Sequence, residues 1–556
     1  MDHEISPNVA RLLTVSFVLI MVSVPAAQLA MEWRAAVFPS SLDVRHLAPR
    51  VDEIERVLGA STLVDEYAAL RACNDRMVLD IHAYEATLKR DAWIVRWAVP
   101  HVQRVITGWL GGGNEDVHCG RDRWLFYRTD VEYLTGRGFL DPEVLAQRGR
   151  AGDPAGGPIQ PDPLRAIVHF RNQLAARGID LVLMPVPVKP AIHPDKLSPR
   201  VVTTRDAVAN PSYATFLARL HALSVKVFDP TGDLLELART SGAPAYLESD
   251  THWTPTAMRH VAGRLATFLA DHCDLPAQPA LTLERFVCTV ENDGDLASML
   301  KVGDASGVIP RQCVEIERVL RPGGQPWSPS DEADVLFLGD SFSTVYSSAA
   351  MGWGDSAGLV EHTSATLGRP IDCIVRNAGG SYATREALAA ELRAGRRDRL
   401  GGKRVVVWQF ADRDLAFGDW RLIDLPQAPS GGHGTALEPS EHELVVRARV
   451  LRTSRVPDPS EPYEDALTYT QYAVVEVEVG VVPHPTIIAI EWSMRRRVVL
   501  GPARYRSGDL HRLRLTSYAA QVRAQPAIEQ IQALDDLDDH DADLYWVQSA
   551  EVLDPR

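Results

Sequence analysis

A short apolar run that ends in a turn constrains this chain more than any other stretch of its sequence. Val335-Leu336-Phe337-Leu338 is typical of a buried strand, and Gly339-Asp340 directly after it is typical of a turn. Ser341 then lies on the turn, ahead of residues 342–351, which we expect to form the following helix. A serine in this position presents its hydroxyl at the top of an α/β sheet, beside backbone N–H groups that can hold an oxyanion.

A second stretch, Ser-Asp-Thr-His-Trp-Thr-Pro at residues 249–255, supplies the partners that a serine nucleophile needs. A serine hydroxyl is a weak nucleophile until a base takes its proton, and His252 is the natural base because its imidazole titrates near neutral pH. Asp250, two residues earlier, can reach the other ring nitrogen and stabilise the imidazolium. We therefore predict that Asp250, His252 and Ser341 form a catalytic triad, called the relay below.

The reaction of such a serine also needs hydrogen-bond donors for the oxyanion that forms during attack. The available donors are the Ser341 N–H, the Asn377 side-chain amide and a glycine N–H from Gly379 or Gly380. Loss of one donor of this kind typically lowers the rate by about 10²–10³-fold.

Two other interpretations of the Asp-x-His stretch remain open at this point. In one, Asp250 caps a helix that starts near Thr254, and His252 only packs beside Trp253. In the other, Asp250 and His252 bind a metal, but no third ligand stands at useful spacing on the same predicted element. We therefore expect neither a metal nor a cofactor at the site.

The region from Val117 to about Leu425 alternates between short apolar strands and helices. This alternation predicts an α/β fold, a mainly parallel sheet with helices on both faces, in which ligands bind beyond the carboxyl ends of the strands. Ser341 and the loop 377–380 both fall on that edge. The expected strands are 124–127, 180–184, 225–228, 335–338, 372–375 and 404–408, and the expected helices are 163–177, 212–223, 254–272 and 385–394.

The N-terminal segment, residues 1–34, is expected to act as a membrane anchor. No residue from Leu12 to Met31 is charged, and about twenty apolar residues are needed to cross a bilayer. The alternative is a cleaved signal peptide with a small-residue site at Val24-Pro25-Ala26. Both interpretations place the rest of the chain outside the cytoplasm.

Three further domains are expected. Residues 35–110 read as a helical stalk or packing region that ends at the glycine-rich break 111–114, and residues 111–428 hold the α/β domain. A Pro/Gly/Ser-rich linker, Gln427 to Glu441, spans the boundary with a small β domain at 429–556. The strands of this domain are expected near 443–450, 470–481, 486–492 and 512–516. The acidic cluster 535–541 fits a solvated loop better than a calcium site, because its spacing matches no ordered loop of ligands.

Composition excludes some partners. The formal net charge of -15 argues against nucleic acid, and the six cysteines contain no C-x-x-C pair, which excludes a zinc ribbon.

The order of these motifs resembles the AlgX/AlgJ (DHHW) family of SGNH-hydrolase-like polysaccharide O-acetyltransferases, in which the Asp-x-His-Trp block precedes the Gly-Asp-Ser block. Further similarity lies in Gly120 to Tyr127, Met184 to Lys189, Asn377 to Tyr382 and Trp408 to Leu415. The resemblance implies an acetyl-serine intermediate at Ser341 and a glycan hydroxyl as acceptor. It also implies a membrane-bound O-acyltransferase partner that brings acetyl groups across the inner membrane, and a catalytic domain on the periplasmic side of that membrane.

Two rival functions remain. A carbohydrate acetylesterase would use the same triad, because water and a sugar hydroxyl compete for one acyl-enzyme. A non-catalytic glycan-binding scaffold of an export complex would leave Ser341 unlabelled. The C-terminal β domain is not clearly the carbohydrate-binding module of the alginate proteins, so alginate itself does not follow.

Overall fold

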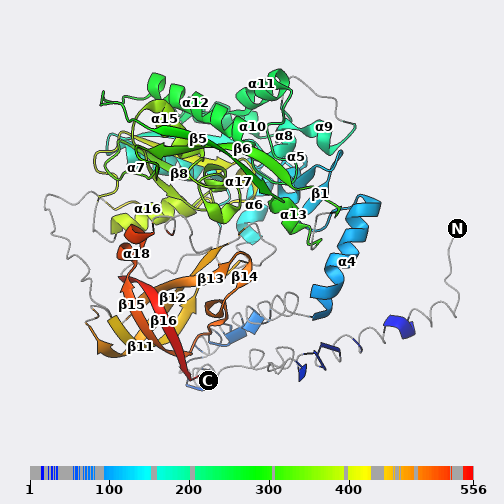
Figure 1. Cartoon of the computed structure of the whole chain (residues 1–556), viewed down its shortest axis with the longest axis vertical. Helices are drawn as coiled ribbons and strands as arrows, with labels where there is room; N and C mark the ends of the chain where they lie inside the picture. Colours follow the sequence, from blue (N-terminus) through cyan, green and yellow to red (C-terminus); the bar gives the residue numbers. More distant parts are fainter. Residues whose placement is uncertain are drawn as a thin grey trace. The chain divides into compact units, whose positions relative to one another are not determined.

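The computed structural model describes residues 93–426 and 444–554 with internal gaps, and only isolated residues ahead of residue 93 (Figure 1). The chain divides into two compact units, residues 1–110 with 301–303, and residues 111–300 with 304–556. Among the described residues, no helix is long and apolar enough to span a bilayer. The predicted anchor, linker and acidic cluster lie wholly or largely outside the described residues.

A five-stranded, fully parallel sheet organises the α/β region, as the alternation of strands and helices predicts (Figure 1). Its middle strands are buried along their whole apolar runs, because helices cover both faces. Each strand overlaps a segment that the sequence indicates. In spatial order the strands are β4 (Lys226–Val227), β3 (Asp180–Val186), β10 (Val405–Ala411), β8 (Val335–Gly339) and β9 (Asp372–Val375).

Alternate residues of each strand enter two separate cores, one on each face of the sheet. Val182 and Met184 of β3 pack in the core beneath α12 (Pro255–His272) and α15 (Leu359–Leu367), which α11 (Thr231–Ser241) flanks. Leu181 and Leu183 of the same strand join the core of the opposite face, whose helices are α7 (Pro163–Ala175), α10 (Tyr213–Ala222) and α16 (Ala383–Arg393). The sheet is therefore covered on both sides, as predicted.

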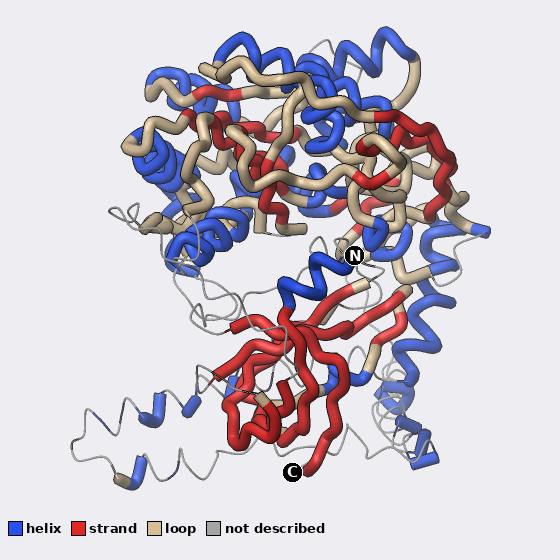
Figure 2. Tube along the Cα trace, turned by 60° about the vertical axis from the view of Figure 1, so that its left-hand side comes forward, coloured by secondary structure: helices blue, strands red, loops and turns tan. Residues whose placement is uncertain are grey.

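The remaining elements of the α/β region lie mainly around the sheet (Figure 2). Its helices are α5 (Arg128–Thr135), α6 (Pro142–Ala151), α8 (Lys189–Ile192), α9 (Pro194–Leu197), α13 (Asp295–Met299), α14 (Ser341–Thr344) and α17 (Asp414–Phe417), and the first unit contains the helix α4 (Trp93–Leu110). The strands are β1 (Val117–Cys119), β2 (Leu125–Tyr127), β5 (Glu284–Asn292), β6 (Gln312–Arg321) and β7 (Gln325–Pro326).

Three features of the α/β region differ from the sequence expectation. The strand expected at 124–127 is β2, which pairs antiparallel with β1 in a separate two-stranded sheet and does not join the parallel sheet. The helix expected at 342–351 is only the single turn α14, followed by a 3-10 turn, Ala349–Met351. The Ser347 hydroxyl donates to the Ser343 carbonyl, and serines that bond to the backbone in this way compete with a continuing helix. The antiparallel pair β5–β6 was not predicted at all.

The C-terminal region is a small β-barrel, built from the four predicted strands and two further ones. Their bounds are β11 (Leu444–Thr453), β12 (Ala466–Val479), β13 (Thr486–Arg495), β14 (Val498–Val499), β15 (Leu510–Ser517) and β16 (Asp543–Asp554), with a 3-10 turn, Gly501–Arg504, and the helix α18 (Tyr518–Ala524). The two further strands are the short β14 and the long β16. β16 joins β15 to β13, and the pairing of β12 with β13 closes the circle.

Candidate active site

Ser341 is the first residue of α14, directly beyond the carboxyl end of β8. Asp340 caps this turn: its Oδ1 accepts from the Phe342 N–H (2.9 Å) and from Gln409 Nε2 (2.6 Å). Its Oδ2 accepts from the Ala411 N–H (3.0 Å) at the end of β10. The turn that carries Ser341 is thus fixed to the neighbouring strand.

The three residues of the predicted relay form one continuous chain of hydrogen bonds. His252 Nε2 lies 2.9 Å from Ser341 Oγ, and His252 Nδ1 lies 2.6 Å from Asp250 Oδ1. Asp250 Oδ1 also accepts from the His252 backbone N–H (3.0 Å). This arrangement fits the tautomer in which Nδ1 carries the proton and Nε2 is free to accept the serine proton.

The first alternative interpretation of Asp250 is wrong. The N-cap of α12 is Thr254, whose side chain accepts from the Ala257 N–H (3.3 Å). Asp250 instead faces inward, where its Oδ2 accepts from the Trp353 indole N–H (2.8 Å) and from the Asp295 N–H (3.0 Å).

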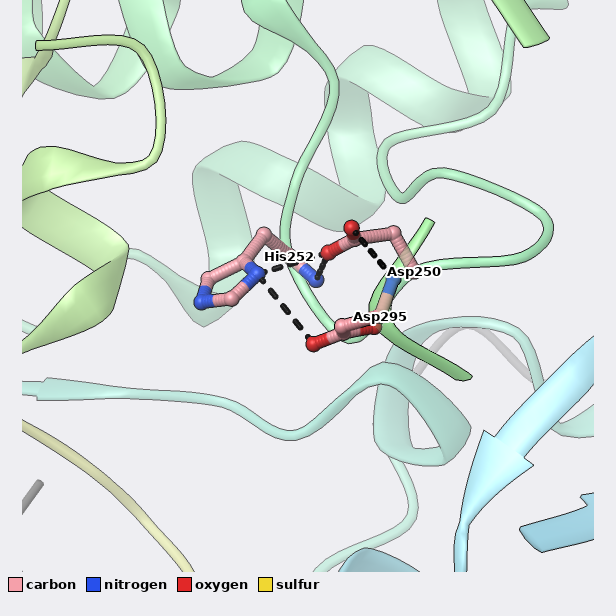
Figure 3. A group of neighbouring side chains, drawn as sticks. All are labelled: Asp250, His252 and Asp295. Carbon is pink, nitrogen blue, oxygen red and sulfur yellow. Dashed lines mark hydrogen bonds and ion pairs between the residues drawn. The ribbon is translucent and has the colours of Figure 1, made fainter. Parts of the chain in front are cut away.

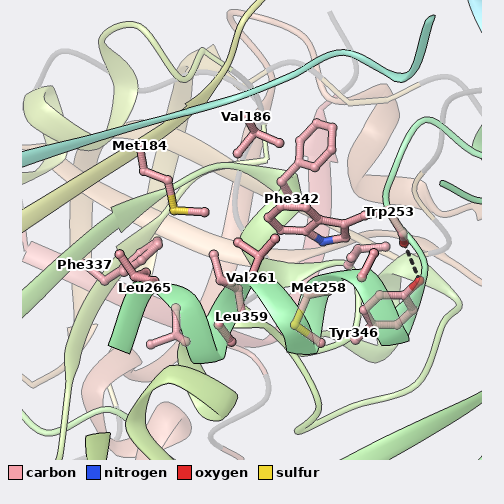
Figure 4. Packing of buried hydrophobic residues seen from close by; sticks show 14 of the residues in the cluster. Met184, Val186, Trp253, Met258, Val261, Leu265, Phe337, Phe342, Tyr346 and Leu359 are labelled. Atoms are coloured by element: carbon pink, nitrogen blue, oxygen red, sulfur yellow. Dashed lines mark hydrogen bonds between the residues drawn. The ribbon is translucent and has the colours of Figure 1, made fainter. Parts of the chain in front are cut away.

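Aromatic packing holds the relay loop against the serine turn (Figure 4). Phe342, next to Ser341, contacts the His252 ring (centroids 4.9 Å apart) and meets the Trp253 ring edge-on (5.3 Å). The Tyr346 hydroxyl donates to the Trp253 carbonyl (2.7 Å). These buried contacts connect two segments that lie about ninety residues apart in the chain.

Asp295 is a second carboxylate beside His252 that the sequence analysis did not identify. Its Oδ2 lies 3.7 Å from His252 Nδ1, and its Oδ1 accepts from the Thr251 N–H (2.7 Å). Figure 3 shows Asp250 and Asp295 on the same side of the imidazole. No local motif marks this residue, because it comes from α13, far along the chain from the Asp-x-His stretch.

The pKa values of His252, Asp250 and Asp295 depend on one another, because each group lies in the electric field of the other two. Burial works against the charged form of His252, but the charge and hydrogen bond of Asp250, with the charge of Asp295, outweigh burial and raise the pKa of His252. Burial alone would raise the pKa of Asp250, yet the charge of His252 and the hydrogen bonds from His252 and Trp353 lower it to about 2. Burial and the charge of Asp250 raise the pKa of Asp295 to about 7. The imidazole therefore faces one fully ionised carboxylate and one that titrates near neutral pH.

Lys189 is fully buried behind the relay loop. Its ammonium donates to the carbonyls of Leu125 (2.5 Å), Glu248 (2.8 Å) and Asp250 (3.1 Å), and it lies 5.1 Å from the centre of the Trp124 ring. Burial lowers the pKa of Lys189 to about 7, against the nearby carboxylates. In the sequence, this residue is a lysine in an otherwise apolar and Pro-rich stretch directly after a strand, a pattern that by itself predicts no role for it.

A second cation, partly buried, lies at the same edge of the sheet. Arg413, beyond β10, pairs with Asp130 (3.0 Å), and its guanidinium lies 5.9 Å from the centre of the Phe342 ring. It follows β10 within the Trp408 to Leu415 stretch noted above.

The predicted oxyanion donors lie near the serine turn. Asn377 Oδ1 accepts from the Thr344 hydroxyl (2.8 Å) at the end of α14, which leaves the amide N–H groups for other partners. A Cβ on Gly380 would lie 3.4 Å from Asp340 Oδ2 and 2.6 Å from Asp414 Oδ2, so a larger residue there would displace the Asp414 carboxylate. Gly379 has a positive φ of 69°. The role of Asn377, Gly379 and Gly380 as oxyanion donors stays a prediction.

Among the described residues, Asp250, His252 and Asp295 are also the one group of His, Cys, Asp and Glu side chains close enough to hold a metal ion, with ligand atoms within 4.8 Å of one another. The third ligand missing from the sequence pattern is thus supplied by the fold. However, His252 Nδ1 and both oxygens of Asp250 already have protein partners, which a metal would displace.

A parallel α/β sheet that carries a Ser–His–Asp hydrogen-bond chain at its carboxyl edge is typical of enzymes that use a serine nucleophile on an α/β fold. Residues 117–412, more than half of the chain, match the model of the family described as “SGNH hydrolase-like domain, acetyltransferase AlgX”. The chain belongs to this family of polysaccharide O-acetyltransferases.

Curated relatives are similar over part of their length. The “Probable alginate O-acetylase AlgJ” of Pseudomonas fluorescens is 31% identical over 192 residues, which cover 34% of this chain and 42% of that protein. The protein of the same name from Pseudomonas aeruginosa is 28% identical over 349 residues, 60% of this chain and 79% of that protein. Among solved structures, the O-acetyltransferase domain of Pseudomonas putida AlgJ matches with a TM-score of 0.40 and 20% identity, over 55% of this chain and 93% of that chain. The match to the first relative thus spans less than half of that relative's length.

Proposed function

We propose that this protein is an exported polysaccharide O-acetyltransferase that carries the acetyl group on Ser341 and passes it to a glycan hydroxyl. The observation that carries the proposal is the unbroken hydrogen-bond chain from Asp250 through His252 to Ser341 Oγ. Membership in the AlgX acetyltransferase family supports transfer of the acetyl group rather than its hydrolysis.

The first half-reaction forms the acetyl-serine. His252 Nε2 takes the Ser341 proton while Ser341 Oγ attacks the carbonyl carbon of an acetyl ester, and Asp250 stabilises the imidazolium. The oxyanion is held by N–H donors, for which the candidates are the Ser341 N–H, the Asn377 side-chain amide and the N–H of Gly379 or Gly380, since the Phe342 N–H already donates to Asp340. The imidazolium then protonates the leaving alcohol.

The second half-reaction reverses these roles. A glycan hydroxyl gives its proton to His252 and attacks the acetyl-serine carbonyl, and the imidazolium returns the proton to Ser341 Oγ as the ester leaves. Water in the same position would make the protein an acetylesterase. A glycan that binds beyond the strand ends and displaces water favours transfer.

The remaining parts of the proposal concern cellular context. We propose that a membrane-bound O-acyltransferase supplies the acetyl group from across the inner membrane. The residue 12–31 run would anchor the chain there with the catalytic domain on the periplasmic side. We also propose the domain division at residues 34, 110 and 428.

Mass spectrometry of the full chain after incubation with p-nitrophenyl acetate tests the chemistry. We expect an acetyl adduct on Ser341 in the wild type and none in Ser341→Ala. Ser343→Ala is the matched control, because Ser343 lies in the same turn but donates to Gln409 (2.6 Å) instead of facing His252. Absence of any adduct on Ser341 would overturn the proposal in favour of the scaffold.

Addition of acetylatable oligosaccharides to the acetylated enzyme separates the two enzymatic functions. Acetylated sugar is the expected product. Release of acetate alone, at every sugar concentration tested, would identify an esterase instead.

A further inference from the structure

The loop that carries the relay is held from its far side by one carboxylate. Asp295 accepts from both the backbone N–H and the hydroxyl of Thr251, the residue between Asp250 and His252. Its own N–H donates to Asp250 Oδ2 (3.0 Å), and the Thr251 oxygen lies 3.2 Å from His252 Nδ1. Asp295, Thr251 and Asp250 are all buried.

We propose that Asp295 is a positioning residue for the acetyl-transfer reaction. It fixes Thr251, and through Thr251 the orientation of Asp250 and His252, and it places a second negative charge beside His252 Nδ1. This inference rests on the proposed function, in which His252 is the base.

The geometry separates this role from that of Asp250. Asp250 bonds directly to Nδ1 at 2.6 Å, whereas Asp295 Oδ2 lies 3.7 Å away, beyond hydrogen-bond distance but close enough for a strong electrostatic effect. Asp295 therefore acts on both the position and the basicity of His252.

Other charged groups surround the pair. Arg413 opposes protonation of His252, while His252 in turn interacts with Asp130 and Asp340 at the edge of the sheet. Asp295 also favours the charged form of Lys189. None of these groups lies on α13, so a change at Asp295 leaves their own contacts in place.

The sign of the electrostatic effect follows directly. A negative charge beside the ring favours the imidazolium, so His252 becomes a free base only at higher pH. Removal of that charge lets the imidazole remain unprotonated to lower pH and makes it a weaker base. Since Asp295 lies beside the ring and its own pKa is raised to about 7, the acid limb of the pH profile belongs to the coupled pair and not to His252 alone.

The rate at which phenylmethylsulfonyl fluoride labels Ser341, measured against pH, tests the inference. For Asp295→Asn we expect the midpoint of the acid limb to move down by about one pH unit, and the rate on the plateau to fall by about tenfold. Thr251→Val removes the hydroxyl but keeps the carboxylate, so its midpoint should move less. Thr251→Ser keeps the hydroxyl, so it should show the wild-type pH profile.

A lower plateau with an unchanged midpoint in Asp295→Asn would overturn the inference, since loss of structure alone does not move the midpoint. NMR titration of the His252 ring in the same variants measures the shift without any reaction. If Ser341 is never labelled, the proposed function fails. If the His252 titration is unchanged in Asp295→Asn, only the role of Asp295 fails.

Discussion

The relay groups of the α/β region and the ion pairs of Glu478 in the β-barrel lie in opposite surroundings. In the α/β region, Asp250, His252, Asp295 and Lys189 are buried beyond the carboxyl ends of the strands. In the barrel, the ion pairs of Glu478 lie on exposed strand faces. The strands explain the difference: β8 is buried throughout, whereas β11 alternates between buried and exposed residues.

This contrast shows which positions of a fold favour a reactive polar site. A sheet covered on both faces leaves only its edges for polar groups, and there the low dielectric strengthens each charge and shifts its pKa. A strand with one exposed face carries its charges in water, where they contribute to solubility and little to reactivity.

The largest effect is expected at the edge of the parallel sheet. Ser341→Ala and His252→Ala should each lower kcat/KM for an acetyl ester by about 10⁴-fold or more, because the three relay groups act as one unit. The double variant should be no worse than either single variant, as steady-state kinetics would show. Two losses that multiply would mean that the residues act independently.

The next effect is a loss of stability in Lys189→Met. Three buried carbonyls lose their donor, which should lower the free energy of unfolding by about 3 kcal/mol. Lys196→Met is the matched control, because Lys196 lies over the same Trp124 ring but pairs with exposed Asp122. Denaturant unfolding measures the free energy of unfolding of both variants. Equal losses in Lys189→Met and Lys196→Met would contradict the distinction between a buried and an exposed charge.

The smallest effect is expected in the barrel. Glu478→Gln removes the ion pairs with Arg447 (2.9 Å) and Arg512 (2.6 Å), and the melting temperature should not change measurably, because these groups are solvated. Leu513→Ala in the barrel core is the positive control and should cost about 2–5 kcal/mol. Thermal unfolding of the two variants tests this. If Glu478→Gln lowers the melting temperature as much as Leu513→Ala does, the ion pairs of Glu478 stabilise the barrel and the prediction is wrong.

Much of the α/β fold could be predicted because its signals are local. Asp180 to Met184 and Asp372 to Val375 are short apolar runs, and β3 and β9 begin at the same residues. The pair β5–β6 could not be predicted because β5 is largely exposed, β6 is mostly half-buried, and neither strand carries a continuous apolar run. β16 was missed because its pattern is weak and its partners, β13 and β15, come from elsewhere in the barrel.

For the site, the sequence by itself determined the order of the elements and the kinds of chemical group, since the Asp-x-His and Gly-Asp-Ser patterns need only a loop and a turn at strand ends. The tertiary structure alone decided that His252 Nε2 meets Ser341 Oγ, that Asp295 joins Asp250 beside the ring, and that Lys189 holds the loop. These contacts join segments far apart in the chain. Burial and distance, which set the strength of each charge, exist only once those segments pack together.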